Sequence, residues 1–519
     1  MDEQNSIQDN SCQDNINSEN YLKAKKALQQ GTSLLLSKQY VKAIKCLSDC
    51  LAIKPNNISA LSNLGFALQS VGKVDEAIIC YNKAIALAPQ YLQAHYNLGN
   101  AQREQGKLAD AVASYKRVIT LNPDYVSAHY NLGYTLQNHG TLDEVIDCYK
   151  KVLAIDPKHR DAMNNLGNAL FDQGKLSQAA TCFEKAIALD PGYADAHNNL
   201  SLTQLLKGDF ANGWIKSKWR WKTDQVNSER YLKYEKYLWQ GESLKNKKLM
   251  LWTEQGVGEN ILFSSMLPDL FKLGAKVFVE FDPRLIPLFK RTYPSITCIT
   301  PQKEQSQEEQ TPKYDYIIPL GDLGCWLRKD ISYFPKQPSW LVHDIKRAES
   351  IRSRYLANGN KYVIGLSWRS NSLKYKYKSI KLRDLMPILE IPGVTFVNLQ
   401  YGDTTQERAE LRQHSGIDVI DDSEVDQMAD LDGFAAQIAA MDMVVTISNT
   451  AAHMAGALGV PTLLMLGVTP IWYWMLERDY SIWYSSVKIC RQKNLTDWSD
   501  VIAQVTDGVK NMLDKPASG

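Results

Sequence analysis

A short polar turn of Ser448, Asn449 and Thr450 separates an apolar run from a run of small residues that contains His453. Hydroxyl and carboxamide side chains in such a place cap free backbone N–H groups, so the pattern predicts a strand, a turn and a helix. A helix that starts above a sheet presents N–H groups and the positive end of its dipole to an anion. With His453 as a further donor, the sequence predicts a phosphate site, most simply for the diphosphate of a nucleotide sugar. The alternative is an ordinary turn of a doubly wound domain, with His453 packed in its core.

A second turn of this kind contains Gly256, Gly258 and Glu259, which follow a predicted strand and precede an apolar helix. The Gly-x-Gly spacing is too short for the full dinucleotide fingerprint, and the Gly-Lys-Ser/Thr ending of a P-loop is absent. By itself, this turn is weak support for a nicotinamide cofactor.

Both turns need a parallel sheet beneath them, and the apolar runs predict two. In the first half, strands are expected over residues 248–253, 276–281 and 314–320, with a helix over 261–273. In the second half, strands are expected over 362–368, 395–399, 419–420 and 443–447, with helices over 404–414, 431–441 and 451–458. Two halves that each begin with a strand and a polar turn predict a two-lobed enzyme with a cleft between the lobes. A last helix, over about 497–513, is expected to cross back over the first lobe.

The composition argues against several classes of protein. The 519 residues include 59 Lys and Arg against 57 Asp and Glu, and this balance argues against a nucleic-acid partner. Nine cysteines without zinc-site spacing predict a cytoplasmic protein with no metal site. No apolar run approaches the roughly 18 residues that span a bilayer. Residues 1–22 are polar, so they are expected to form a disordered tail and not a signal peptide.

The first two hundred residues contain an internal repeat. Asn-Leu-Gly recurs at 63–65, 97–99, 131–133 and 165–167, an interval of 34 residues, which is the tetratricopeptide period. Stacked helix–turn–helix units of this kind form a superhelix with a concave groove. We expect five full units from about residue 24 and a degenerate sixth. The repeated glycines let the two helices touch, and Tyr81, Tyr115, Tyr149 and Phe183 fill the seam between units.

A column of asparagines follows the inner helices of the repeat. Its members are Asn63, Asn97, Asn131, Asn165 and Asn199. A carboxamide is both donor and acceptor, so such a column can bind a peptide backbone whatever its side chains are. The column resembles the asparagine ladder of protein O-GlcNAc transferases, which holds the polypeptide acceptor. The alternative is that each asparagine caps or bridges its own repeat. A second column, His95, His129 and His197, is expected to pack and not to bind metal.

Several short motifs occur in a fixed order along the rest of the chain. They are Glu-Gln-Gly-Val-Gly-Glu at 254–259, Ile-Gly-Leu-Ser-Trp-Arg at 364–369, Val-Asn-Leu-Gln at 397–400, His-Met-Ala-Gly-Ala-Leu-Gly at 453–459 and Arg-Gln at 491–492. Together they resemble bacterial tetratricopeptide proteins that end in a glycosyltransferase domain of the ADP-heptose–lipopolysaccharide heptosyltransferase type, which is family 9-like and has the GT-B fold. The resemblance covers about residues 24–513.

The resemblance implies an α/α tetratricopeptide superhelix followed by an α/β GT-B domain of two Rossmann-like lobes. The implied boundaries are a tail at 1–22, repeats at 23–227, a connector and acceptor lobe at 228–340, a donor lobe with its return helix at 341–513, and a tail at 514–519. The implied activity is an inverting, metal-independent sugar transfer that uses a nucleotide sugar and no cofactor.

The resemblance also implies roles for single residues. Glu259 stands in the place of an aspartate general base, and Ser448 stands where relatives often carry aspartate. The donor-binding set is Ser448, Asn449, Thr450, His453, Arg369, Lys378, Gly258 and Gln400. Arg369 and Lys378 are expected to offset the charge on the departing diphosphate. For Lys374 and Lys376 in the same loop, a solvated strand edge is an equal alternative.

Three functions are compatible with these features. The first is a cytoplasmic protein glycosyltransferase that modifies Ser or Thr of a polypeptide held in the groove. The second is a scaffold with an inactive transferase-like domain, which the replaced acids at Ser448 and Glu259 keep open. The third is a transferase for glycan or lipid acceptors, with the repeats recruiting a protein partner.

Overall fold

The chain forms two compact units, Met1–Leu170 and Phe171–Gly519. The computed structural model describes residues 3–137, 140–223, 229–253, 256–299, 313–370, 379–495 and 497–514. The boundary between the units therefore falls inside the repeats and not at residue 227. The physical reason is that Phe210 and Trp214, in the last repeat helices, are buried in the same apolar core as the sheets.

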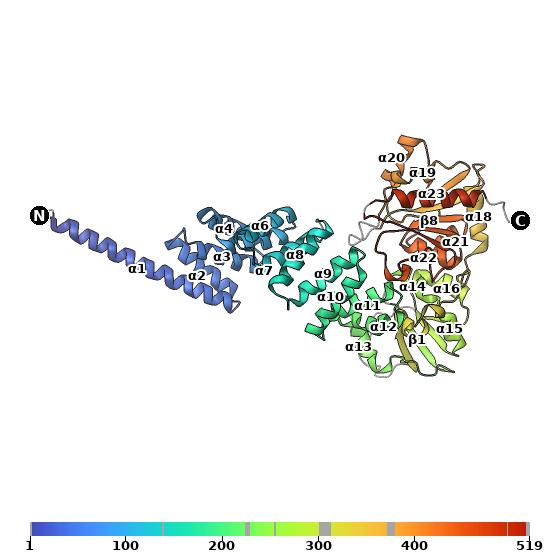
Figure 1. Cartoon of the computed structure of the whole chain (residues 1–519), viewed down its shortest axis with the longest axis horizontal. Coiled ribbons are helices and arrows are strands. Elements are labelled where there is room, and N and C mark those ends of the chain that lie inside the picture. Colours follow the sequence, from blue (N-terminus) through green and yellow to red (C-terminus); the bar gives the residue numbers. More distant parts are fainter. Residues whose placement is uncertain are drawn as a thin grey trace. The chain divides into compact units, whose positions relative to one another are not determined.

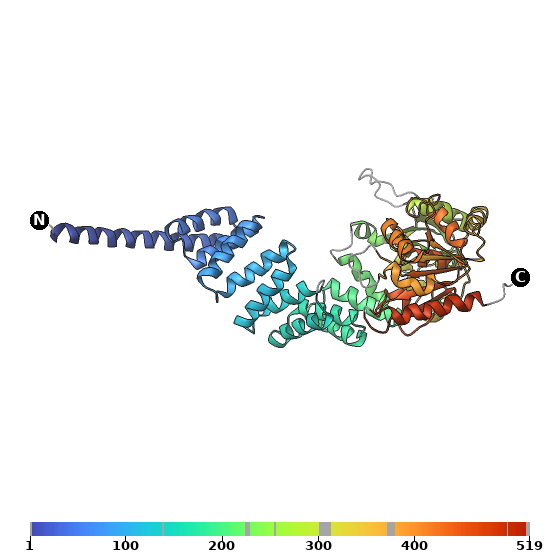
Figure 2. The same ribbon diagram turned by 90° about the horizontal axis from the view of Figure 1, so that it is seen from above.

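The first unit consists of helices that pair in sequence order (Figure 2). They are α1 (Glu3–Leu36), α2 (Tyr40–Ile53), α3 (Ile58–Ser70), α4 (Val74–Leu87), α5 (Leu92–Glu104), α6 (Leu108–Leu121), α7 (Val126–Leu136), α8 (Leu142–Ile155) and α9 (Arg160–Asp172), the last of which crosses the boundary. The disordered tail expected at 1–22 is wrong for most of its length, because α1 begins at Glu3. No proline or glycine interrupts the chain before Gly31, so a helix can continue through the polar segment.

The repeated glycines meet aromatic rings of the partner helix. A Cβ added to Gly65 would lie 2.6 Å from Cε1 of Tyr81, and one added to Gly99 would lie 2.7 Å from Cε1 of Tyr115. Tyr81 is fully buried and also packs with Leu98 of the following unit. The predicted contacts of the glycines are confirmed, and Tyr81 fills the contact within its own unit as well as the seam to the next.

The second unit opens with the end of the repeats. Helices α10 (Leu176–Leu189), α11 (Ala194–Leu206), α12 (Phe210–Ser217) and α13 (Glu229–Tyr234) precede the first sheet. Trp214 of α12 is 4% exposed, and its indole Nε1 donates to the carbonyl oxygen of Arg328 at 2.9 Å. Its ring lies against Gly324, where an added Cβ would approach Cζ2 of Trp214 to 2.2 Å. The last repeat is thus part of the core of this unit.

The first sheet contains four parallel strands in the order β3-β2-β1-β4. The strands are β1 (Lys248–Trp252), β2 (Lys276–Glu280), β3 (Thr297–Ile299) and β4 (Tyr316–Pro319), and the helices between them are α14 (Val257–Ser264), α15 (Leu267–Lys272) and α16 (Ile286–Thr292). The single helix expected over 261–273 is two helices that begin earlier. The break precedes Pro268, which is tolerated in the first turn of α15 but not inside a helix.

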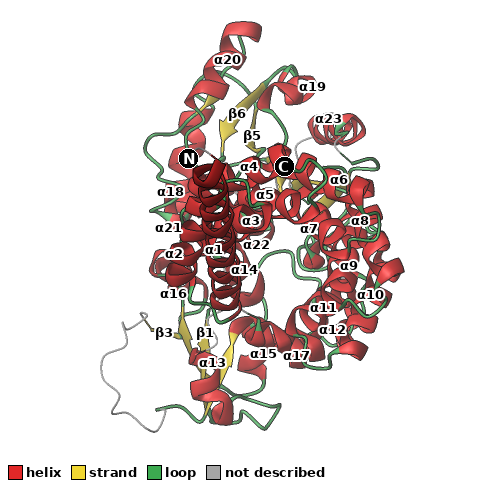
Figure 3. Ribbon diagram, turned by 90° about the vertical axis from the view of Figure 1, so that its left-hand side faces the viewer, coloured by secondary structure: helices red, strands yellow, loops and turns green. Residues whose placement is uncertain are grey.

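The second sheet contains six parallel strands in the order β10-β9-β8-β5-β6-β7 (Figure 3 shows the strands of both sheets). They are β5 (Tyr362–Ser367), β6 (Val394–Asn398), β7 (Val419–Ile420), β8 (Met443–Ile447), β9 (Thr462–Leu466) and β10 (Val487–Arg491). The chain runs outward from β5 to β7 and then crosses to β8, which is the order of a dinucleotide-binding sheet. In such sheets ligands bind at the carboxyl ends of the strands where the order reverses, which here are the ends of β5 and β8.

Helices cover this second sheet (Figure 1). They are α18 (Ile345–Tyr355), α19 (Met386–Leu389), α20 (Thr405–Ser415), α21 (Leu431–Ala439), α22 (Thr450–Leu458) and α23 (Ser499–Leu513). The expectation that the last helix crosses the first lobe is wrong, since α23 packs on β9, β10 and α19. Its apolar face, with Val501 and Val505, is buried in one core with Ile364 and Met443 of the sheet.

No helix in the described part of the chain combines the length and the apolar character that crossing a bilayer requires.

Candidate functional site

The β8–α22 turn begins with an internal cap. Asn449 precedes α22, and its Oδ1 accepts from the backbone N–H groups of Ala451 at 3.0 Å and Ala452 at 3.4 Å. Its Nδ2 donates to the hydroxyl oxygen of Ser367, at the end of β5, at 2.6 Å. The cap residue therefore satisfies the N–H groups of Ala451 and Ala452, which are not available to an anion. Asn449 joins the ends of β5 and β8, and the helix dipole remains as the attraction for an anion.

His453 is packed, as in the alternative interpretation of the sequence. Its side chain is 2% exposed, its Nδ1 lies 2.8 Å from the hydroxyl of Tyr484, and its ring stacks on Trp474 with centroids 5.2 Å apart. Burial lowers the pKa of His453 to about 3, so the imidazole is neutral at ordinary pH. That His453 also donates to a phosphate stays a prediction. His453 stabilises the turn through its contacts with Tyr484 and Trp474.

The burial of His453 predicts an acid-sensitive stability. The pKa of His453 is about 3 in the folded chain, against an ordinary value of 6.5. Between these values the unfolded chain binds the proton and the folded chain does not, so stability falls as pH drops below about 6.5, by up to ~1.4 kcal/mol per pH unit. Urea unfolding should show that the free energy of unfolding falls less from pH 7 to pH 5 in His453→Gln than in the wild type. The matched control is His414→Gln, on the exposed side of α20. Equal slopes in all three proteins would contradict the prediction.

Gly258 lies where α14 packs against His453 of α22 (Figure 1). A Cβ added to Gly258 would lie 2.7 Å from Cδ2 of His453. Gly258 therefore has a packing role, because only glycine lets the two helices meet at this distance.

Replacing Gly258 with alanine is expected to destabilise the second unit by about 1–3 kcal/mol, since the buried imidazole must move. The matched control is Gly256→Ala, where the added Cβ meets only the carboxylate end of Glu259 at 3.2 Å. Thermal unfolding of the two variants measures the difference. A Gly258→Ala protein as stable as the Gly256→Ala protein would refute the close contact.

Glu259 lies in the first turn of α14, next to Gly258, which lies against His453 of α22. The hydroxyl of Tyr473 donates to its Oε1 at 3.4 Å. Burial raises the pKa of Glu259 above its ordinary value, and hydrogen bonds from its own backbone N–H and from Tyr473 partly oppose that rise. A carboxylate with a raised pKa is a stronger base than a solvated one, which suits proton abstraction near neutral pH.

Ser448 meets an aromatic segment that we did not foresee. The 3₁₀ helix η8 (Trp472–Trp474) lies between β9 and β10, and Nε1 of Trp474 donates to Oγ of Ser448 at 2.8 Å. The hydroxyl of Ser448 therefore holds an indole N–H. The signal was visible in the sequence as the run Ile-Trp-Tyr-Trp-Met at 471–475. Ser448, Asn449 and Thr450 are all half-buried.

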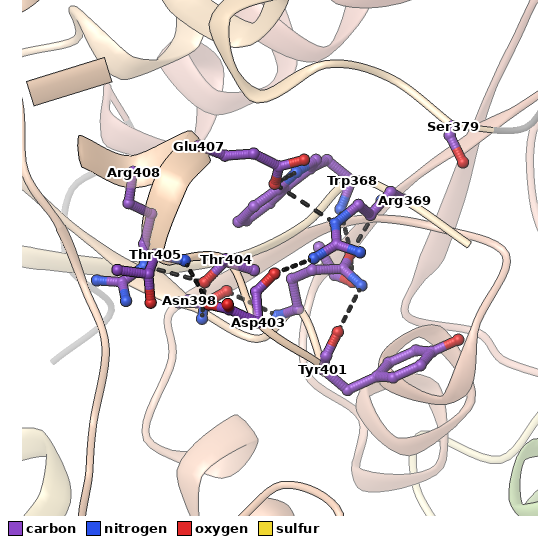
Figure 4. Close-up of polar contacts among 12 residues, drawn as sticks. Trp368, Arg369, Ser379, Asn398, Tyr401, Asp403, Thr404, Thr405, Glu407 and Arg408 are labelled. Atoms are coloured by element: carbon purple, nitrogen blue, oxygen red, sulfur yellow. Dashed lines mark hydrogen bonds and ion pairs between the residues drawn. The ribbon is translucent and has the colours of Figure 1, made fainter. Parts of the chain in front are cut away.

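The loop after β5 contains a polar network (Figure 4), which Ser367 connects to Asn449 of the β8–α22 turn. Oε1 of Gln400 accepts from the hydroxyl of Ser367 and from the backbone N–H groups of Trp368 and Arg369, at 2.8–3.1 Å. Gln400 is 1% exposed, and its Nε2 donates to the carbonyl oxygen of Tyr401. Gln400 thus shapes the loop, and its role in donor binding stays a prediction.

The guanidinium of Arg369 lies in the same network (Figure 4). It pairs with the carboxylate of Glu407 at 3.4 Å and donates to the carbonyl oxygen of Asp403. The carboxylate of Glu407 offsets part of the positive charge of Arg369, which we expect to face the departing diphosphate. Lys374, Lys376 and Lys378 lie outside the described residues.

The asparagine column connects neighbouring repeats. Nδ2 of Asn131 donates to the hydroxyl of Tyr96 at 3.0 Å and to Oδ1 of Asn100 at 2.9 Å, both in the preceding repeat. Nδ2 of Asn165 donates to the hydroxyl of Tyr130 at 3.2 Å in the same way.

Other members of the two columns follow related patterns. Nδ2 of Asn63 donates to Thr32, while Asn97 accepts from Gln93 on its own helix. Asn199 lies on α11, in the second unit. Most of these contacts run to the preceding repeat and only that of Asn97 stays within its own, and peptide binding by the column stays a prediction. The histidine column packs as expected, since His129 Nε2 lies 2.8 Å from the carbonyl oxygen of Pro123, and His95 and His197 repeat the contact.

Comparisons with known proteins identify the repeats. The family described as TPR repeat matches residues 70–102, 99–140 and 167–208, and the tetratricopeptide repeat family matches residues 126–159. The N-terminal helices are therefore tetratricopeptide repeats, as the period predicts.

Similar proteins include Protein FlbA of Caulobacter vibrioides, which is 32% identical over 290 residues, or 53% of this chain and 48% of FlbA. The chain thus spans about half the length of this curated relative. Among solved structures, MamA is 28% identical with a TM-score of 0.30, and the match covers 32% of this chain and 96% of MamA. The TPR protein YrrB is 23% identical with a TM-score of 0.31, over 34% of this chain and 92% of YrrB.

Proposed function

We propose that the chain is a GT-B-type glycosyltransferase that transfers a sugar from a nucleotide sugar to Ser or Thr hydroxyls of a polypeptide held by the repeats. The observation that carries the proposal is the position of Glu259, a carboxyl group with a raised pKa at the start of α14. This helix packs against α22, which starts at the ligand-binding end of the second sheet.

The two parallel sheets support the proposal. Each has the strand order of a nucleotide-binding half, and the second reverses its order between β5 and β8. Ser448 and Thr450, which are half-buried between the end of β8 and the start of α22, offer hydroxyl groups to a sugar or a phosphate. The resemblance to glycosyltransferases implies that the donor binds in the second lobe.

The chemistry that the chain would supply is simple. Glu259 takes the proton from the acceptor hydroxyl. The hydroxyl oxygen of the acceptor then bonds to the anomeric carbon of the sugar, and the bond from that carbon to the diphosphate breaks. The helix dipole of α22 stabilises the leaving diphosphate. That the transfer needs no cofactor and takes place in the cytoplasm stays a prediction.

Thermal stabilisation by nucleotide sugars is the most direct test of a donor site. The native protein should melt at a higher temperature with one nucleotide sugar at saturating concentration than with the free sugar, because ligands that bind the folded state stabilise it. Release of nucleoside diphosphate on addition of an acceptor polypeptide then tests turnover. Mass spectrometry of a co-expressed partner distinguishes a polypeptide acceptor from a glycan or lipid acceptor. If no nucleotide sugar changes the melt, the transferase proposal fails.

A protein-interaction scaffold is the second candidate. Tetratricopeptide repeats are protein-binding modules, and the internal cap of α22 and the burial of His453 give the β8–α22 turn a stable structure without a ligand. A scaffold should capture its polypeptide partner without any nucleotide sugar and release no nucleoside diphosphate.

A further inference from the structure

The segment Trp472–Met475 contacts several separate parts of the second unit. The ring of Trp472 lies 5.2 Å from that of Trp214 in α12, the last full helix of the repeats, and 6.5 Å from that of Phe263 in α14. All these distances join ring centroids. The segment therefore lies between the end of the repeats and the helix that carries Glu259.

The next two residues bond to predicted site residues. Tyr473 is 3% exposed and donates its hydroxyl to Oε1 of Glu259 at 3.4 Å. Trp474 is 1% exposed and donates its indole N–H to Oγ of Ser448 at 2.8 Å. Both rings also pack on His453, with centroids 5.1 Å and 5.2 Å from the imidazole. Packing of the rings would not need the hydroxyl of Tyr473 or the indole N–H of Trp474. These two polar groups instead bond to Glu259 and Ser448.

Met475 ends the segment in an unusual backbone conformation. Its φ is +52°, in the left-handed region that non-glycine residues seldom adopt. The surroundings impose this geometry, since Nη2 of Arg491 donates to the carbonyl oxygen of Met475 at 2.8 Å. A Cβ added to Gly208, in the turn between α11 and α12, would lie 2.9 Å from Cε of Met475. The last repeat hairpin thus touches the strained end of the segment.

We propose that Tyr473 and Trp474 are positioning residues for Glu259 and Ser448, and that the segment Trp472–Met475 transmits the position of the last repeat hairpin to the carboxyl group of Glu259. The proposal rests on the proposed function in one respect, namely that Glu259 is the proton acceptor. The groups that face Glu259 are the phenols of Tyr473 and Tyr484 and its own backbone N–H on α14, while His453 lies against the neighbouring Gly258.

Tyr473→Phe tests the positioning role, because it keeps the ring and removes only the hydroxyl. The hydroxyl stabilises the ionised carboxylate, so its loss should raise the pKa of Glu259 by roughly 0.5 of a pH unit. The pKa is measured by carbon NMR of protein labelled at the glutamate carboxyl carbons, with the signal assigned from its disappearance in Glu259→Gln. The matched control is Tyr480→Phe, whose ring is 58% exposed. If the signal titrates identically in Tyr473→Phe and in the wild type, the positioning role is overturned.

The same variant distinguishes this proposal from the proposed function. If the transferase function also holds, the acid limb of the rate profile in Tyr473→Phe moves to higher pH by the same amount, while the donor KM is unchanged. A shifted NMR titration in a protein that consumes no nucleotide sugar supports the positioning role and rejects the transferase function. A uniform loss of rate without any shift of either profile means that Tyr473 is structural only.

Gly208→Ala tests the connection to the repeats. Gly208 and Gly106 occupy the same turn position in different repeats, with φ of +85° and +75°, so alanine strains both backbones alike. A Cβ at Gly106 meets no atom of the described residues within 4 Å, whereas one at Gly208 pushes on Met475. The carbon NMR signal of the Glu259 carboxyl group should change its chemical shift in Gly208→Ala and keep it in Gly106→Ala.

Met475→Gly gives an independent test if Gly208→Ala folds poorly. It relieves the left-handed backbone but removes the side chain that touches Gly208. Its control is Glu477→Gly, where glycine relieves a φ of +56° at an exposed residue. The Glu259 signal should move in Met475→Gly only. If it moves in neither or in both, the connection through the segment is rejected.

Discussion

Replacing Glu259 with glutamine is expected to lower the rate of nucleotide-sugar consumption by about 10²–10⁴-fold, the range for removal of a general base. Glutamine has the same shape but cannot accept the proton of the acceptor hydroxyl. Because the variant impairs removal of the acceptor hydroxyl proton and leaves the donor contacts intact, the KM for the donor should stay near its wild-type value. The wild-type rate should fall as pH drops through the raised pKa of Glu259, because only the ionised form is a base. That acid limb should be absent from the residual activity of the variant.

The stability of the same variant separates catalysis from folding. The pKa of Glu259 is raised in the folded chain, so folding disfavours its ionised form, and stability is lost as pH rises through the folded pKa. At pH 7 the uncharged glutamine should therefore melt at or above the wild-type temperature. Glu235→Gln, an exposed glutamate of the connector, serves as the control for activity and melt. A raised donor KM with unchanged turnover would mean that Glu259 binds the donor and does not abstract a proton.

Replacing Trp214 with alanine is expected to destabilise the second unit by about 3–5 kcal/mol, the range for truncating a buried tryptophan. The indole is 4% exposed, its N–H bonds to the carbonyl oxygen of Arg328, and its ring fills the space left by Gly324. The loss leaves a cavity between the repeats and the first sheet and an unpaired buried carbonyl. Urea unfolding, followed by tryptophan fluorescence and circular dichroism, measures the change.

The control for Trp214 is Trp219→Ala. Trp219 is half-buried and stacks on His197 with centroids 3.9 Å apart, but it lies outside the shared core. Replacing Trp219 should lower the free energy of unfolding clearly less than replacing Trp214. Equal, small losses for both variants would contradict the assignment of the last repeat to the second unit.

Local patterns in the sequence determined most of the elements. The interval of 34 residues fixed the helical repeats, and the small residues opposite Tyr81 and Tyr115 are explained by contacts between adjacent helices. The strand predicted over 443–447 coincides with β8, because a run that is apolar on both faces is typical of a strand buried in a parallel sheet. These features depend on residues that are close in the chain, so periodicity and composition were sufficient.

The tertiary structure decided what the polar residues do. His453 and Asn449 occupy the predicted turn, yet one is a buried, neutral ring and the other caps its own helix. The burial of His453 depends on Gly258 and Trp474, which come from distant parts of the chain. A sequence pattern can place a donor at the start of a helix, but whether that donor meets a ligand or a neighbouring side chain is set by which surfaces pack together. For the same reason the aromatic segment at 472–475 gained its contacts with Glu259 and Ser448 only in the folded chain.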